Sequence, residues 1–153
     1  MSSPNRSHAA SRRVYFQLQT TANRLRGVAD ELFQDAAGIT TAQAAALSII
    51  VRDPGCSQRT VAGLLRQRES AITTMAARLV AAGFVERKPS PTDARAWELW
   101  PTPAGTNAMA RLETARAELN ALIETAVGPQ KVQVFADALT RLTSALDARD
   151  ASR

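Results

Sequence analysis

The sequence predicts a mainly α-helical fold with one small β hairpin, and two observations favour this class. Aromatic residues make up only 5% of the 153 residues, while hydrophobic residues make up 45%. The core must therefore consist mostly of Leu, Ala, Val and Ile, which suits the packing of helices. Apolar residues also recur at spacings of three and four along most of the chain, whereas only two short segments are typical of strands.

The N-terminal part of the chain contains two helical patterns. Residues 1–10 form a polar leader that we expect to be disordered. After it, apolar residues three and four positions apart predict a long amphipathic helix over 11–36. The run Thr40-Thr41-Ala42-Gln43 has the Ser/Thr-x-x-Glu/Gln pattern of a capping box, and it opens a second, nearly buried helix through 44–51.

The middle of the chain has the order of a helix-turn-helix followed by a β hairpin. Ser57 is a suitable N-cap for a short helix over 58–65, and a few residues separate this helix from a fourth one over 69–82. The strand-like segments 84–88 and 96–100 flank a proline-containing loop, and they predict the hairpin. In the fourth helix, the residues expected to face the core are Ile72, Met75, Ala76 and Leu79.

Two further helices are predicted at the C-terminal end, over 103–127 and 129–148. Thr102-Pro103 gives the first of them an N-cap followed by proline, and Gly128-Pro129 separates the two. The last helix carries a heptad-type seam of apolar residues, namely Val132, Phe135, Leu139, Leu142 and Leu146.

These C-terminal helices and the helix over 11–36 need partners for their apolar stripes. A small winged helix over 40–101 offers them little to cover. We therefore interpret the three long helices as dimerisation helices of a single domain spanning 11–153. The alternative is that the seam closes within one chain.

Positive charge is concentrated in the middle of the sequence. The formal net charge is +5, and residues 52–95 carry eight cations against four anions. Almost all of the cations are arginines. A basic segment of this kind indicates contact with nucleic acid, although a merely solvated basic surface is the alternative.

Several classes of function are excluded. Cys56 is the only cysteine and His8 the only histidine, so we expect neither a disulfide framework nor a metal site within one chain. Neither a glycine-rich phosphate loop nor a Ser/His/Asp set can be assembled, so we expect no cofactor and no enzyme activity. The longest apolar run, 44–51, is far shorter than the roughly 18 residues of a spanning helix. We therefore expect a cytoplasmic protein without membrane contact, and a structural role for Cys56 is favoured over a redox role.

Short motifs across the middle of the chain resemble the winged helix of MarR-type transcriptional regulators. The resemblance covers residues 11–148 and is most specific across 57–105. The matching motifs are SQRTVA at 57–62, LL at 64–65, SAIT at 70–73, RL at 78–79, GFVER at 83–87, DAR at 93–95 and TPAG at 102–105. Three positions depart from the family pattern. Arg68 stands where an acidic residue often caps the recognition helix, Thr74 where an arginine is common, and Trp100-Pro101 where a smaller residue and leucine are usual.

The fourth helix corresponds to the recognition helix of that family. A helix fits the major groove, and the short hydroxyl and long cationic side chains on its exposed side can reach base edges or phosphates. Side chains that are merely solvated are the alternative interpretation. The predicted recognition residues are Gln67, Arg68, Ser70, Thr73, Thr74 and Arg78.

The hairpin, or wing, supplies a second predicted contact. Arg95 matches the wing arginine of the family, which the resemblance implies enters the minor groove, where the negative potential attracts guanidinium groups. We expect Asp93 to orient neighbouring arginines rather than contact DNA, or to serve only as a turn residue. Arg87 and Lys88, on the preceding strand, are expected to contact phosphates, which positions the protein without reading sequence.

The resemblance implies a sequence-specific regulator of transcription that binds double-stranded DNA. We expect a homodimer on a pseudo-palindromic operator, acting as a repressor that responds to a ligand. Small aromatic anions are effectors of many family members, and we assign no ligand site. The rival interpretation is a winged-helix module that binds protein and no DNA.

Overall fold

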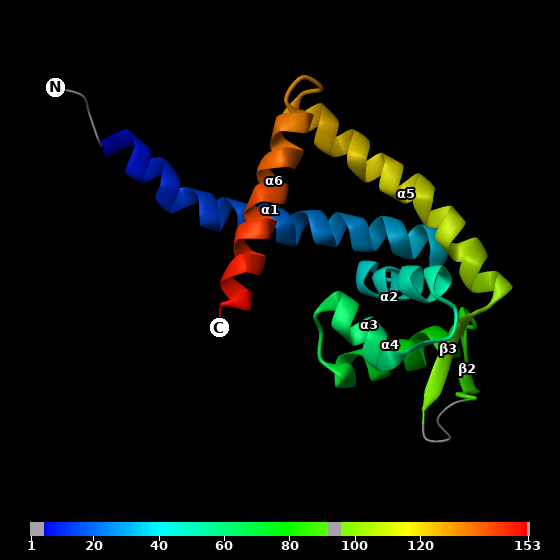
Figure 1. The fold of residues 1–153 in the computed structure, drawn as a ribbon. Helices are drawn as coiled ribbons and strands as arrows, with labels where there is room; N and C mark the ends of the chain where they lie inside the picture. Colours follow the sequence, from blue (N-terminus) through cyan, green and yellow to red (C-terminus); the bar gives the residue numbers. More distant parts are fainter. Residues whose placement is uncertain (1–4, 92–95, 153) are drawn as a thin grey trace. The chain divides into compact units, whose positions relative to one another are not determined.

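The computed structural model describes residues 5–91 and 96–152, with side chains from Arg13 onwards. In chain order the elements are α1 (Asn5–Ala37), α2 (Thr41–Arg52), β1 (Cys56–Ser57), α3 (Gln58–Leu65), α4 (Glu69–Ala81), β2 (Val85–Pro89), β3 (Trp97–Pro101), α5 (Pro103–Val127) and α6 (Val132–Ala151), as Figure 1 shows. The fold is therefore mainly helical with a small antiparallel sheet, and the predicted fold class is confirmed. None of the helices in the described part of the chain is both long and apolar enough to span a membrane.

The sheet has one strand more than the predicted hairpin. Its order is β1-β3-β2, and both pairings are antiparallel. Cys56 in β1 pairs with Leu99 in β3, and the preceding Gly55 donates its N–H to the Leu99 carbonyl at 2.8 Å. A two-residue strand has no alternation that a sequence pattern could reveal, because tertiary pairing alone defines it. The hairpin expectation was therefore incomplete at this edge.

Two helix ends also differ from the expectation. Helix α1 begins at Asn5, so residues 5–10 of the leader expected to be disordered are helical, and the rest of that leader lies outside the described residues. Neither glycine nor proline interrupts the chain between Asn5 and Gly27, which favours a continuous helix. Helix α6 begins at Val132 rather than at 129, because Gly128 adopts a left-handed φ of 93° in a turn closed by Lys131.

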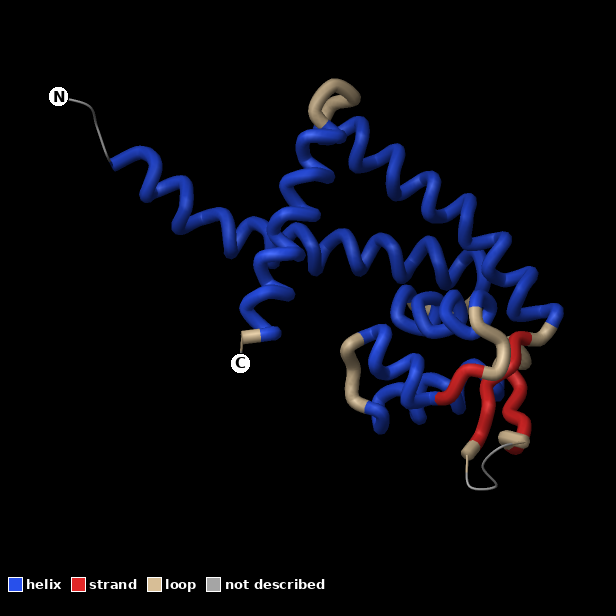
Figure 2. The backbone as a smooth tube through the Cα atoms, in the orientation of Figure 1, coloured by secondary structure: helices blue, strands red, loops and turns tan. Residues whose placement is uncertain are grey.

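The chain divides into two compact units, Met1–Ala115 and Arg116–Arg153. In the first, α2 lies at the centre and contacts α1, α3, α4 and β3, and Figure 2 shows the paired strands beside these helices. Full burial of an aliphatic side chain stabilises a fold by about 1.5–3 kcal/mol. The largest fully buried side chains of this core are Ile39, Leu47, Ile50, Val61, Ile72, Leu79, Val85, Leu99 and Leu112.

Side-chain hydrogen bonds from the helix start itself and from α1 stabilise the N-terminus of α2. Thr40 and Gln43 form the predicted capping box, with each side chain bonded to the other residue's backbone N–H. From α1, the Asp30 carboxylate accepts hydrogen bonds from the Thr41 hydroxyl at 2.6 Å and from the Thr41 N–H at 2.7 Å. Both bonds lower the pKa of Asp30, and the bond from the hydroxyl has the larger effect. The charge of Arg26 lowers this pKa further. A carboxylate at a helix N-terminus also complements the helix dipole.

A close contact joins the sheet to α5. The Thr102 hydroxyl donates to the Gly83 carbonyl at 2.7 Å and accepts from the Gly105 N–H at 3.0 Å. A Cβ atom on Gly105 would lie 2.1 Å from the Phe84 carbonyl oxygen, so only glycine fits there. Six residues further along α5, Arg111 donates from Nε to the Ala36 carbonyl near the end of α1 at 2.9 Å. The Thr-x-x-Gly motif therefore fixes where α5 begins.

The second unit contains the end of α5 and the whole of α6. Ala115 is the last buried residue of α5, and α6 has no buried residue. Four residues of its predicted seam are exposed, with exposed fractions of 41% for Phe135, 36% for Leu139, 43% for Leu142 and 52% for Leu146. The second unit by itself therefore leaves the α6 seam uncovered.

Candidate nucleic-acid interface

Helices α3 and α4 form the helix-turn-helix. Ser57 caps α3, as its position predicted, by accepting a hydrogen bond from the Thr60 N–H at 3.1 Å. The turn after α3 depends on Arg66, whose φ of 51° is left-handed and unusual for a residue with a Cβ. Arg68 occupies the N-cap of α4 without making a side-chain cap bond, so the departure from the family pattern leaves this end uncapped by a side chain.

The face of α4 that points away from the core carries the predicted recognition residues. Ile72, Ala76 and Leu79 are at most 2% exposed and hold α4 against the core, while Met75 is half-buried. The opposite face thereby remains available to a ligand as large as a duplex. Each of the candidates is exposed, namely Gln67, Arg68, Ser70, Thr73, Thr74 and Arg78.

Two of these candidate hydroxyls already have partners within the protein. The Thr74 hydroxyl lies 3.3 Å from the Ser70 carbonyl, one turn earlier in the same helix. The Thr73 hydroxyl lies 3.0 Å from the Glu69 carbonyl and 2.7 Å from Oε1 of Gln58, the first residue of α3. Sequence reasoning missed Gln58, because a contact between residues fifteen positions apart has no local signal.

In the wing, the structure places the two strand cations on opposite faces of the sheet. Arg87 is opposite Leu99 and shares its face, whereas Lys88 is opposite Glu98 on the other face. Among the described residues, Nε and Nη2 of Arg87 are buried and have no hydrogen-bond partner. Buried donors without an acceptor are costly to the fold, and in this conformation neither atom is accessible to a phosphate.

The face of Lys88 has its own interactions. Its Nζ lies 3.8 Å from Oε1 of Glu86 and 5.0 Å from the centre of the Trp100 ring, and Trp100 in turn donates from Nε1 to Glu98 at 3.2 Å. This cluster on the sheet competes with a phosphate for the ammonium group. The other two predicted wing residues, Asp93 and Arg95, lie outside the described residues.

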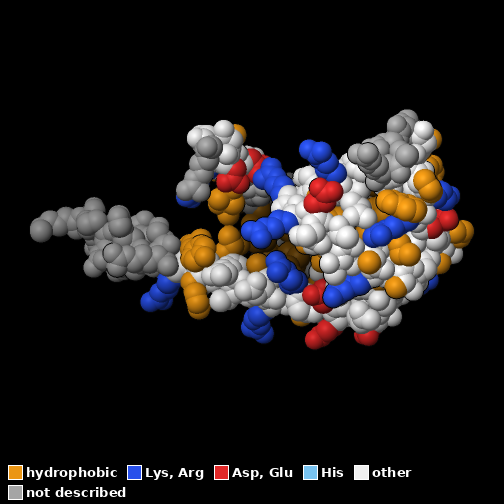
Figure 3. Space-filling model, turned by 90° about the horizontal axis from the view of Figure 1, so that it is seen from below, with side chains coloured by type: hydrophobic (Ala, Val, Ile, Leu, Met, Phe, Trp, Pro, Cys, Tyr) orange, Lys and Arg blue, Asp and Glu red, His pale blue; other side chains and the backbone are white. Residues whose placement is uncertain are grey.

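Charge over the winged helix is predominantly positive. Figure 3 shows arginine and lysine side chains spread over the visible side of the first unit, among mostly uncharged atoms and a few carboxylates. The surface therefore combines cations with polar groups that can donate or accept hydrogen bonds. This combination is suited to the phosphates and groove edges of a duplex.

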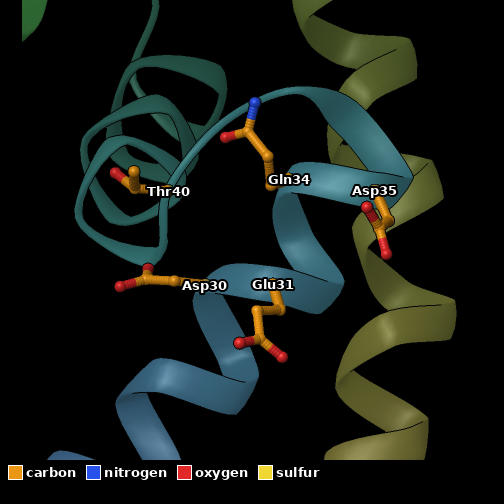
Figure 4. A pocket seen from close by; sticks show the side chains of 5 residues that line it. All are labelled: Asp30, Glu31, Gln34, Asp35 and Thr40. Atoms are coloured by element: carbon orange, nitrogen blue, oxygen red, sulfur yellow. The ribbon is translucent and has the colours of Figure 1, made fainter.

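An open hollow of about 530 Å³ lies beside the C-terminal part of α1. Figure 4 shows its lining side chains, which are Asp30, Glu31, Gln34, Asp35 and Thr40. Three carboxylates and no cation line it, which is unfavourable for the small aromatic anion that the resemblance suggested. We assign no effector to this hollow.

Cys56 is a buried residue of strand β1, with 6% of its surface exposed. Burial raises the pKa of its thiol, and the charge of Asp53 adds to this effect. Both causes disfavour the reactive thiolate, which supports a structural role for this residue. In the part of the chain that the structure describes, no group of three His, Cys, Asp or Glu residues could hold a metal ion.

A helix-turn-helix whose exposed second helix stands beside an antiparallel wing defines the class of this protein. It is a winged helix-turn-helix, an architecture in which the second helix is suited to enter the major groove. Comparisons with known proteins narrow this class.

The MarR family model matches residues 37–96. A candidate transcriptional regulatory protein for the hcr operon of Thauera aromatica is 36% identical over 78 residues, which are 51% of this chain and 47% of that protein. The chain therefore spans about half the length of this relative. Over residues 37–96, which include most of the winged helix, the chain therefore matches the MarR family of winged helix-turn-helix transcriptional regulators, which is a family of regulators and not of enzymes.

Solved structures share the fold over most of the chain. The PcaV transcriptional regulator from Streptomyces coelicolor is 26% identical, with a TM-score of 0.70 over 85% of this chain and 97% of that one. PcaV has also been solved in complex with its natural ligand. FabT of Streptococcus pneumoniae, solved in complex with DNA, is 18% identical, with a TM-score of 0.76 over 90% of this chain and 98% of that one.

Proposed function

We propose that this chain is a sequence-specific regulator that binds double-stranded DNA through α4 and the wing. The single observation that carries the proposal is the exposed face of α4, where Arg68 and Arg78 flank a row of hydroxyl side chains. This face suits the major groove, since arginine reads guanine edges and hydroxyl groups accept or donate at either base pair.

The wing residues have separate roles in this proposal. Arg87 is proposed to contact a backbone phosphate, and Arg95 is proposed to enter the minor groove. Lys88 contributes less, because Glu86 and Trp100 compete for its ammonium group. Asp93 orients neighbouring arginines.

The protein acts as a homodimer in this proposal. The exposed α6 seam of Phe135, Leu139, Leu142 and Leu146 supports the dimer, because exposed apolar stripes of this kind are typical of helices that pair. A dimer would place two recognition helices roughly 34–36 Å apart, which is one turn of DNA. The operator would then be a pseudo-palindrome of two half-sites.

The regulator is proposed to be a cytoplasmic repressor that a small aromatic molecule releases from its operator. The structure of PcaV in complex with its natural ligand supports a ligand response, since that protein has the same fold and is 25% identical to this chain. A ligand can release DNA only if it binds the two states of the protein with different affinity. A panel of phenolic compounds, added to the operator complex, tests this part: release by at least one compound is expected, and no release by any would contradict it.

Binding-site selection from random-sequence duplexes tests the central part of the proposal. We expect a two-half-site sequence whose affinity falls steeply between low and physiological salt. Selection of isolated, asymmetric half-sites would contradict the dimeric arrangement. No binding even at low salt would contradict DNA recognition and favour a winged-helix module for protein interaction.

A further inference from the structure

We propose that Gln58 is a further DNA-contact residue, which donates its side-chain amide to a backbone phosphate while its carbonyl oxygen holds the Thr73 hydroxyl. This inference rests on the proposed function, because it needs a duplex on the α3–α4 face. It adds a residue of the first helix of the motif to a surface otherwise assigned to α4 and the wing. It also predicts what kind of contact this residue makes.

The starting point is the hydrogen bond between the two helices of the motif. The Thr73 hydroxyl lies 2.7 Å from Oε1 of Gln58 and 3.0 Å from the Glu69 carbonyl. A hydroxyl has one proton, and the shorter distance favours its donation to Gln58. The bond therefore fixes the glutamine amide with its oxygen toward α4.

Fixing the oxygen leaves the amide nitrogen as the free end of Gln58. Within the described residues the Nε2 group makes no hydrogen bond, so both of its N–H donors remain for solvent or a ligand. Gln58 is half-buried at the start of α3, and its neighbour Arg59 is exposed. A rigid pair of donors thus lies at the edge of the recognition surface.

A phosphate is the DNA group that this geometry favours. The first helix of a helix-turn-helix crosses the DNA backbone, and phosphate oxygens accept hydrogen bonds from side-chain amides. Glutamine reads adenine only when its oxygen and its nitrogen are both free, and Thr73 already occupies the oxygen. Gln58 should therefore add affinity without adding sequence preference.

Gln58 carries no charge, and this distinguishes its phosphate contact from that of an arginine. Because the amide is neutral, its contact releases no counterion and leaves the salt dependence of binding unchanged. One hydrogen bond of this kind contributes about 0.5–1.5 kcal/mol, which corresponds to about two- to tenfold in affinity.

The test compares Gln58→Glu and Gln58→Ala with wild type in fluorescence anisotropy titrations, on the selected operator and on a random duplex. Gln58→Glu keeps an acceptor for Thr73 but replaces the two donors with a carboxylate, which phosphates repel. We expect it to weaken binding at least about tenfold on both duplexes, and Gln58→Ala to weaken it about two- to tenfold with an unchanged salt slope. Asn120→Asp, which changes the charge equally on the exposed part of α5, should stay within about twofold.

Three outcomes would overturn the inference. Wild-type affinity in Gln58→Glu would show that the residue only positions Thr73. A loss confined to the operator, with the random duplex unaffected, would make Gln58 a reader of bases. Failure of the wild-type chain to bind either duplex would contradict the proposed function itself. The wild-type titration shows this before any variant is measured.

Discussion

The winged-helix unit and helix α6 use similar amphipathic patterns, yet they bury their apolar residues very differently. In the first, Leu47, Leu79 and Leu99 are inaccessible to solvent. In the second, every residue of the helix is at least partly exposed, and Leu142 and Leu146 show about half of their surface. The first unit is therefore built around a core of its own, whereas the apolar stripe of α6 is not buried within the second unit.

This difference separates two ways in which an apolar stripe can act. A stripe buried within the chain contributes to the free energy of unfolding whatever the protein concentration. A stripe that only a second copy covers contributes in proportion to the amount of dimer. Substitutions in the two regions should consequently differ in kind as well as in size.

The largest effect is expected at the contact between the sheet and α5. Gly105→Ala would place a methyl group against the backbone oxygen of Phe84, so β2 and α5 would have to separate. We expect a loss of about 3–5 kcal/mol in the free energy of unfolding, measured by urea denaturation. Gly63→Ala is the matched control, because its Cβ would meet no atom within 4 Å, and it should stabilise by about 0.5–1 kcal/mol. Equal effects of the two changes would contradict the close contact.

A pair of leucines tests the comparison itself. Leu47→Ala should cost about 3 kcal/mol through the cavity it leaves, at every protein concentration. Leu142→Ala should instead weaken dimerisation by about tenfold or more, and its effect on the melting temperature should depend on concentration. Sedimentation equilibrium and thermal melts at several concentrations measure both. A monomeric wild type, or a concentration-independent loss in Leu142→Ala, would contradict the assignment of α6 to a dimer.

Strain in the turn between α3 and α4 gives a smaller effect. Arg66→Gly should stabilise the winged helix by about 1 kcal/mol, because glycine adopts a positive φ without a Cβ penalty. Gly83→Ala is the opposite change at a φ of 75° in open space, and it should destabilise by a similar amount. Thermal melts of both variants measure these changes, and we expect a higher melting temperature for Arg66→Gly. A lower melting temperature for Arg66→Gly would argue against strain at this turn.

The smallest effect concerns Asp30 at the start of α2. Hydrogen bonds from Thr41 lower its folded pKa, so the stability it contributes is present above the unfolded value of about 3.9 and is lost as the pH falls through the folded one. Asp30→Asn should destabilise by about 0.5 kcal/mol at pH 7 and match wild type at the acid end. Glu31→Gln, at a carboxylate without a hydrogen bond in the described chain, is the control. A pH-independent difference would exclude the ionised carboxylate as the cause.

The parts of this fold that could be predicted are those with local causes. Helix α3 begins and ends where the sequence predicts, because Ser57 caps it and the turn follows at once. The capping box of Thr40 and Gln43 was also confirmed, since its two partners are only three residues apart. The buried face of α4 followed from spacing alone, and the exposed face was then its complement.

What the sequence could not show depends on partners far apart in the chain. Strand β1 exists because Cys56 meets Leu99, and Asp30 meets Thr41 only after α1 and α2 have packed. The pairing of Gln58 with Thr73 likewise needs the turn that brings α3 and α4 together. The DNA roles of the α4 and wing residues remain predictions, because they describe a complex rather than a chain.

The salt dependence of operator binding tests the central claim most directly. Arg68→Ala with Arg78→Ala removes two cations from the α4 face, whereas Arg141→Ala with Arg149→Ala removes two exposed cations from α6. The proposed homodimer loses two cations at each half-site, four in all. Plotting the logarithm of affinity against that of salt concentration should therefore give a slope about 3.6 smaller in magnitude for the first pair, and an unchanged slope for the second. The same slope for wild type and the α4 pair, or an equal reduction in both pairs, would contradict binding through this face.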